Sequence, residues 1–142
     1  MTQNLKAQKC LSQYLEKNVE LILQGTILGH LPSGKNQYGI SKKILYKQAP
    51  IIGYEKDFLP QAQVLKNKYK IPQPLEDMVV AVYAKIYFRD YRRDVDLILF
   101  CDLLQKSLIL KNDRMIRVKF IDGIHVDKVN PRIEFELYDL HE

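Results

Sequence analysis

Three aspartates in the second half of the chain have the types and spacing of a magnesium site. Asp94 and Asp96 follow a long apolar stretch, directly after Arg92 and Arg93, and Asp113 stands where the next apolar stretch ends. Carboxylate oxygens are hard ligands of the kind that Mg²⁺ prefers. A metal held in this way neutralises a phosphate, activates a water and stabilises a leaving oxygen. The residues therefore predict phosphodiester hydrolysis, and their spacing alone leaves open whether Asp113 returns to the other two.

An isolated Asp-x-Asp is a weak motif, because many such pairs lie in ordinary surface loops. Here the pair follows the apolar run 78–88. In a strand, alternate residues face opposite sides of the sheet, and in this run the residues of both sets are apolar, as in a strand covered on both faces. Functional groups of α/β sheets gather where central strands end. The position therefore favours a functional site, in which Arg92 and Arg93 either contact phosphate or solvate the strand end.

A helix is expected after the aspartates. Four apolar residues recur there at steps of three and four: Leu97, Phe100, Leu104 and Leu108. Asp94 or Asp96 is expected to cap the start of this helix, which should end near Leu110. Cys101 lies within the apolar run and is expected to pack in the core.

The other expected elements are a helix at 4–17, strands at 19–28 and 44–46, a loop at 30–36 and a helix at 55–68. Pro60 would lie in the first turn of the last helix or break it. Residues 116–124 and 132–138 are expected to pair as a terminal hairpin. Alternate residues of its second strand should be buried: Ile133, Phe135 and Leu137. The residues between them should be exposed to solvent: Glu134, Glu136 and Tyr138. The sum is a single α+β domain with a mixed β-sheet and helices packed on it.

The length of 142 residues fits one domain with its own core. No apolar run approaches the ~20 residues of a membrane span, and the first residues lack the order of a signal peptide, so a cytoplasmic protein without a membrane partner is expected. Cys10 and Cys101 form neither a disulfide framework nor a zinc motif. His30, His125 and His141 are isolated and have no partner spacing for zinc.

Positive charge is concentrated in the first two thirds of the chain. The net charge is +5, but up to Arg93 there are 15 Lys and Arg against 7 Asp and Glu, and from Asp94 onward 7 against 10. No acidic residue lies between Glu20 and Glu55. Four lysines stand there among three tyrosines: Lys35, Lys42, Lys43 and Lys47. This basic stretch indicates either a polyanion-binding loop or an ordinary solvated lysine face.

Four segments, in order, resemble the RusA-like Holliday-junction resolvases, which are magnesium-dependent endonucleases that act as homodimers. The family pattern has a strand ending in Arg-Asp-x-Asp-Asn, a helix with an Asp-Ala-Leu segment, an Asp-Asp-x-x-Ile turn and an upstream Pro-Ser-Asn-Asn-x-Tyr loop. The matching segments here are Arg93-Asp94-Val95-Asp96, Asp102-Leu103-Leu104-Gln105-Lys106, Asn112-Asp113-Arg114-Met115-Ile116 and Pro32-Ser33-Gly34-Lys35-Asn36-Gln37-Tyr38.

The resemblance implies a RusA-like endonuclease domain at 19–142, preceded by an N-terminal helical extension at 1–18. It implies that Asp94, Asp96 and Asp113 are catalytic and hold Mg²⁺. Residues expected to contact branched DNA are Arg92, Arg93, Ser33, Lys35, Asn36, Lys42 and Lys43. The implied activity is structure-selective hydrolysis of four-way junctions by a homodimer.

The sequence departs from the family pattern in two places. The family has a lysine shortly after the Asp-x-Asp-Asn motif, whereas this chain continues with Leu97-Ile98-Leu99-Phe100 and is two residues shorter before Asp102. Such a lysine would place a cation near the charge that develops in the transition state. Possible substitutes are Lys85, Lys106 and Lys111. Asn112 replaces the first aspartate of the turn, which removes a charge and keeps an oxygen ligand.

These departures leave two alternatives to an active nuclease. One is a catalytically weak or inactive protein of the same fold that binds branched DNA. The other is a basic α+β domain that binds RNA or a protein and contains an incidental aspartate loop. Convergence of Asp94, Asp96 and Asp113 within metal-bridging distance would exclude the second.

Overall fold

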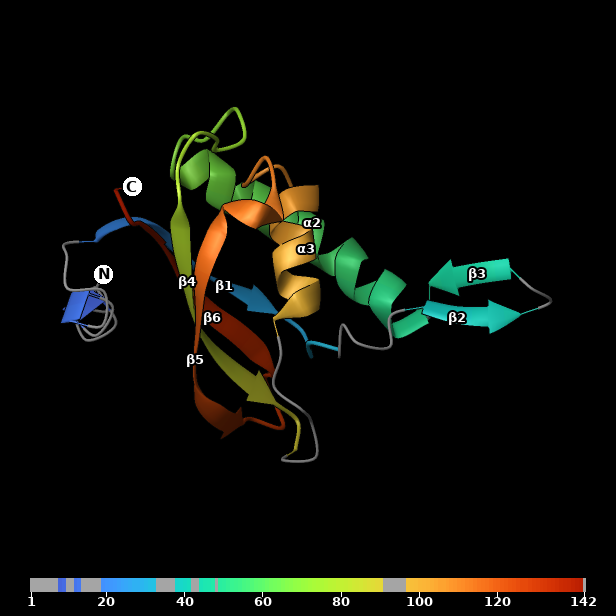
Figure 1. Cartoon of the computed structure of the whole chain (residues 1–142). Helices are drawn as coiled ribbons and strands as arrows, with labels where there is room; N and C mark the ends of the chain where they lie inside the picture. Colours follow the sequence, from blue (N-terminus) through green and yellow to red (C-terminus); the bar gives the residue numbers. More distant parts are fainter. Residues whose placement is uncertain are drawn as a thin grey trace.

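The computed structural model describes residues 8–9, 12–13, 19–32, 38–41, 44–47, 49–90 and 97–141. The elements in chain order are β1 (Glu20–Leu28), β2 (Tyr38–Ser41), β3 (Ile44–Lys47), α2 (Ala49–Lys68), β4 (Val80–Phe88), α3 (Ile98–Lys106), the 3-10 turn η2 (Asp113–Met115), β5 (Ile116–Val126) and β6 (Arg132–Asp139) (Figure 1). The four described residues before residue 19 are helical, as expected for 4–17.

Four strands form one mixed sheet in the order β1-β6-β4-β5. β4 is parallel to β5 and antiparallel to β6, which is in turn antiparallel to β1. The single α+β domain and the central place of the strand at 78–88 are therefore confirmed. The expected hairpin of 116–124 with 132–138 is wrong, because β4 lies between β5 and β6 and pairs with both. This insertion satisfies the main-chain polar groups of β4 on both sides.

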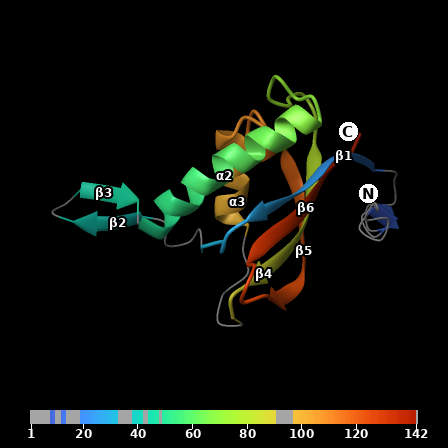
Figure 2. The ribbon, with the colours of Figure 1, turned by 180° about the vertical axis from the view of Figure 1, so that it is seen from behind.

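Helices α2 and α3 cover one face of the sheet (Figures 1 and 2). Phe100 of α3 is fully buried and meets Phe58 of α2 and Phe135 of β6 nearly edge to face, with ring centroids 5.8 and 4.9 Å apart. Aromatic pairs in this geometry stabilise beyond the area they bury. Phe100 therefore joins both helices to the sheet.

Helix α2 is longer than expected and continues through Pro60. It begins at Ala49 rather than near Glu55, and Pro60 lies in its interior, so the expectation of a break or a late start is wrong. Pro60 is exposed, on the side of the helix away from the sheet. The hydrogen bond that proline cannot donate is thus missing on the solvent side, where helices bend most easily. The buried residues on the other side include Ile51, Tyr54, Phe58, Ala62 and Leu65.

Helix α3 begins and ends without the features expected from its sequence. Its N-cap is Leu97, which makes no capping hydrogen bond, so the expected cap by Asp94 or Asp96 is wrong. The helix ends at Lys106, and Leu108, expected on its buried side, is exposed and has φ +65°. Leu108 leaves the helical conformation because the chain must reverse toward β5 within a few residues. Cys101 is buried, as expected.

A second, smaller apolar cluster covers part of the other face of the sheet. Tyr83 of β4 stacks on Phe120 of β5, with ring centroids 5.0 Å apart, and Tyr138 of β6 is buried beside them. Glu136 is also buried. The expectation that Glu134, Glu136 and Tyr138 form a wet face is therefore wrong for the latter two, because both faces of β6 are covered near its end.

The strands β2 and β3 pair with each other, in a two-stranded sheet that lies beyond the start of α2 (Figures 1 and 2). The strand expected at 44–46 is confirmed as part of β3, whereas β2 was not expected. No helix within the described ranges is long and apolar enough to span a membrane.

Candidate functional site

The carboxyl ends of β1, β4 and β5 lie at one edge of the sheet. β1 and β4 are both antiparallel to β6, so they run in the same direction as each other and as β5. His30, two residues after β1, packs edge to face on Phe88, the last residue of β4, with ring centroids 5.6 Å apart. In open α/β sheets, ligands bind outside the carboxyl ends of such strands.

The contact of His30 with Phe88 brings together the starting points of two predicted functional segments. The chain enters the predicted DNA loop directly after Pro32, and it enters the Asp-x-Asp segment directly after Asp90. The last described residues before the two segments, Pro32 and Asp90, therefore follow strands that end at the same edge of the sheet. The predicted site residues within them lie outside the described residues: Ser33, Lys35, Asn36, Lys42, Lys43, Arg92, Arg93, Asp94 and Asp96.

Asp113 lies at the other end of α3, where β5 begins beside Val80 of β4. Its main-chain N–H donates to Oε1 of Gln105 on α3 (3.1 Å), which holds it against the helix. Oδ1 of Asn112 accepts the N–H of Arg114 (2.8 Å) and caps η2. The Asn112 oxygen, expected to remain available as a metal ligand, is therefore engaged in fixing the turn.

Asp113 lies far from the start of α3, so the residues that could hold a metal with it must come from another part of the chain. Leu97 and Asp113 are at opposite ends of α3, whose nine residues rise about 13 Å. Within the described part of the chain, no three His, Cys, Asp or Glu side chains gather closely enough to hold a metal. A magnesium site on Asp113 therefore depends on Asp94 and Asp96.

The three lysines proposed as substitutes for the family lysine have other surroundings. Lys106 Nζ binds Glu55 Oε2 at 2.7 Å, and Lys111 Nζ binds Glu76 Oε2 at 2.6 Å. Lys85 alternates on β4 with residues that pack under the helices, so it points to the opposite face, where its hydrogen bond with Tyr87 raises the pKa of its ammonium. The ammonium groups of these three lysines thus interact with Glu55, Glu76 and Tyr87 rather than with Asp113.

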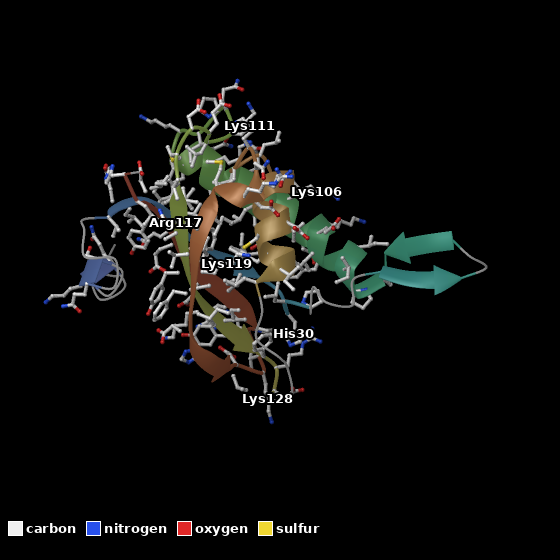
Figure 3. All side chains as sticks on the ribbon, in the orientation of Figure 1. His30, Lys106, Lys111, Arg117, Lys119 and Lys128 are labelled. Atoms are coloured by element: carbon white, nitrogen blue, oxygen red, sulfur yellow. The ribbon has the colours of Figure 1, made fainter. Side chains whose placement is uncertain are left out.

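A different lysine, Lys119 of β5, lies on the face of the sheet that α3 covers. It pairs in register with Val82, whose side chain packs in the core under the helices. Side chains in register on neighbouring strands point to the same face. Lys119 is exposed at the outer strand, and Figure 3 shows it beside α3.

The pKa of the buried Cys101 thiol depends on charged residues close to it. Burial raises the pKa of Cys101 to about 11, while Lys119 lowers it and Asp113 and Asp102 raise it further. Because such effects fall with distance, Lys119 and Asp113 both lie close enough to Cys101 to influence its thiol. Lys119 thus lies on β5 on the face that α3 covers, and Asp113 lies in the turn η2 that leads into the same strand.

Simple alternation along the sequence would not have placed Lys119 there. A register shift between Val80 and Ala81 makes Arg117 an extra residue, so that Ile116 and Lys119 share a face despite being three positions apart. Bulges of this kind change which side chains a strand presents. The signal lies in the pairing of β5 with β4, which the chain alone does not reveal.

No protein-family model matches this chain, and no curated protein matches it as a relative. The functional assignment therefore rests on the placement of individual residues in the fold. The most informative placements are the His30–Phe88 contact and the position of Lys119 on the face of the sheet that α3 covers.

Proposed function

We propose that the protein is a structure-selective, magnesium-dependent DNA endonuclease of the RusA-like type that cuts four-way junctions. The observation that supports this proposal is the contact of His30 with Phe88, which brings together the ends of the two strands that precede the basic loop and the Asp-x-Asp segment in the sequence. A polyanion held by the basic loop would then lie next to carboxylates suited to Mg²⁺.

In this proposal, Asp94, Asp96 and Asp113 hold Mg²⁺, and Arg92 and Arg93 bind the phosphates on either side of the scissile bond. Asp113 offers hard oxygen donors and its main chain is fixed to Gln105, but it lies at the opposite end of α3 from Leu97, so it shares the metal only if a carboxylate of the Asp-x-Asp segment reaches along the helix to it. When bound, Mg²⁺ supplies charge neutralisation and an activated water. A homodimer would present two such sites to the two-fold symmetric junction.

The activity is tested with a labelled four-way junction and a linear duplex of the same sequence. The expected result is paired nicks near the branch point in Mg²⁺, loss of nicking in EDTA, and little cutting of the duplex. Persistent junction binding without nicking in Mg²⁺ or Mn²⁺ would refute the nuclease.

A second function is favoured by the placement of the lysines. Lys106 and Lys111 are bound to glutamates, and Lys85 lies on the face of the sheet opposite to α3, so none of the three lysines named from the sequence is placed to supply the missing cation. A protein without that cation would bind junctions and cut them slowly or not at all. Salt-dependent junction binding with no effect of Mg²⁺ on the DNA would support this alternative.

Lys119 distinguishes the two functions. If it supplies the missing cation, Lys119→Ala should lower the cutting rate by about 10²-fold, as expected for the loss of one charge-stabilising group, and Lys119→Arg should retain much of the rate. The measurement is single-turnover cutting of the junction at saturating protein.

Lys56→Ala on the exposed side of α2 is the matched control, since it removes the same charge away from the site. Equal rates for Lys119→Ala and Lys56→Ala would show that Lys119 has no catalytic part.

A further inference from the structure

The turn between β5 and β6 is held in one shape by Asp127. Its Oδ1 accepts the main-chain N–H groups of Val129 (3.1 Å) and Asn130 (3.0 Å). The bond from Asn130, the guanidinium of Arg132 and the bond from Val129 lower the pKa of the Asp127 carboxyl. An aspartate that binds the main chain two and three residues on fixes a turn without a glycine.

Arg132 secures the same turn from its other side. Its Nη1 donates to Asp127 Oδ2 (2.9 Å) and to the carbonyl of Asn130 (3.0 Å), and its Nε donates to Glu134 (3.0 Å). The guanidinium also lies over the ring of Tyr87, 3.8 Å from the centroid. A guanidinium that binds two carboxylates and a main-chain carbonyl and also stacks on a ring has little freedom left. The turn is therefore rigid before any partner arrives.

Both ends of the turn are bonded to the strand ends that begin the two predicted functional segments. The N–H of Asp127 donates to the carbonyl of Phe88 (2.8 Å), and the N–H of Gly29 donates to the carbonyl of Pro131 (3.0 Å). Figure 3 shows Lys128 and His30 at this same end of the sheet, away from Lys106 and Lys111. The turn thus joins the ends of β1 and β4, the two strands that precede the basic loop and the Asp-x-Asp segment in the sequence.

The tip of the turn exposes one apolar side chain beside one cation. Val129 is 94% exposed, and Lys128 and Asn130 are also exposed. Single exposed apolar residues are common and by themselves need no explanation. Val129 differs because the turn that carries it is fixed by at least five hydrogen bonds of its neighbouring residues. The turn also lies at the edge of the sheet where DNA is proposed to bind.

We propose that the Asp127–Arg132 turn contacts the branch point of the DNA, with Lys128 on a backbone phosphate and Val129 packed on a base face that the branch leaves exposed. This role rests on the proposed function for its substrate class. Apolar side chains that enter between bases stabilise bent or opened DNA, and phosphate contacts position them. Because the turn is already fixed, little conformational entropy is lost on binding.

The test compares Val129→Ala, Lys128→Ala and the control Val64→Ala, which shortens a valine that is 66% exposed on α2. Dissociation constants are measured for a four-way junction and for a linear duplex of the same sequence. Val129→Ala should weaken junction binding by about tenfold, the factor that two buried methyl groups contribute, and leave duplex binding unchanged. Lys128→Ala should weaken binding to both DNAs and lower the salt slope by about 1.

A second measurement reports the base contact itself. A 2-aminopurine placed at the branch point should brighten when wild-type protein opens the stack and brighten less with Val129→Ala. Thermal unfolding of each variant, monitored by circular dichroism, should match the wild type, because neither side chain contributes to the core.

The outcomes separate this inference from the proposed function. Wild-type binding to the junction with equal affinities for Val129→Ala and Val64→Ala would overturn the role of the turn and leave the nuclease intact. Failure of the wild type to prefer the junction would overturn the substrate class and with it this role. Loss of self-association in Val129→Ala, seen by sedimentation without any change in DNA affinity, would make the turn an interface between copies and overturn the DNA contact.

Discussion

Asp94→Asn is expected to reduce junction cutting in Mg²⁺ by roughly 10²–10³-fold while junction binding is unchanged or tighter. The amide is a poorer magnesium ligand than the carboxylate, so the catalytic effect is large. The substitution also removes a negative charge next to the phosphate backbone, which reduces electrostatic repulsion. Nicking and binding are measured on the same labelled junction, the former at saturating protein.

Asp57→Asn is the matched control, because it makes the same change of charge on the exposed side of α2. It should cut at the wild-type rate. Asp113→Asn should behave like Asp94→Asn if the two carboxylates share one metal. Full activity of Asp113→Asn beside an inactive Asp94→Asn would restrict the metal site to the Asp-x-Asp segment.

Phe100→Ala is expected to lower the free energy of unfolding by about 3–5 kcal/mol, which is a large part of the stability of a domain of this size. Phe100 is fully buried and contacts the rings of Phe58 and Phe135, so its removal leaves a cavity between both helices and the sheet. The measurement is equilibrium unfolding in urea, with a common slope for wild type and variant.

Ile98→Ala serves as the control on the same helix, since Ile98 is exposed. Its cost should be below about 1 kcal/mol, as for most surface substitutions. A loss of similar size in both variants would contradict the special role of the aromatic cluster, because alanine has the higher helix propensity at both positions and cannot itself weaken the helix.

Local pattern predicted much of the fold. The run from Val80 to Phe88 is apolar on both alternations, and it is the central strand because only a central strand is covered on both faces. The spacing of Phe100 and Leu104 likewise placed α3 and its buried side. In these cases one segment contains the whole signal.

Predictions failed where the outcome depends on two distant segments. β6 pairs with β1 and β4 rather than with the adjacent β5, and no feature of residues 132–139 distinguishes these partners. Pro60 is tolerated because tertiary packing of α2 outweighs one missing hydrogen bond on its exposed side.

For the candidate site too, the sequence predicts the residue types but not how distant residues come together. The residue types of Asp94, Asp96 and Asp113 indicate a metal from sequence alone, whereas their convergence depends on how the chain returns along α3. Lys119 was missed because a register shift in β5 decides which way it points. The basic loop and the aspartate segment were each predicted separately, and the contact of His30 with Phe88 relates them.

The outer position of β5 has a consequence for assembly. In the described sheet β5 pairs on one side only, with β4, and its other side presents main-chain groups that a second copy could extend into a continuous sheet. Exposed charged side chains at Arg117 and Lys119 and two register shifts make such edge-to-edge joining unfavourable. The strand that carries Lys119, the proposed source of a cation, is thereby also protected against polymerisation, and the proposed dimer would form through another surface.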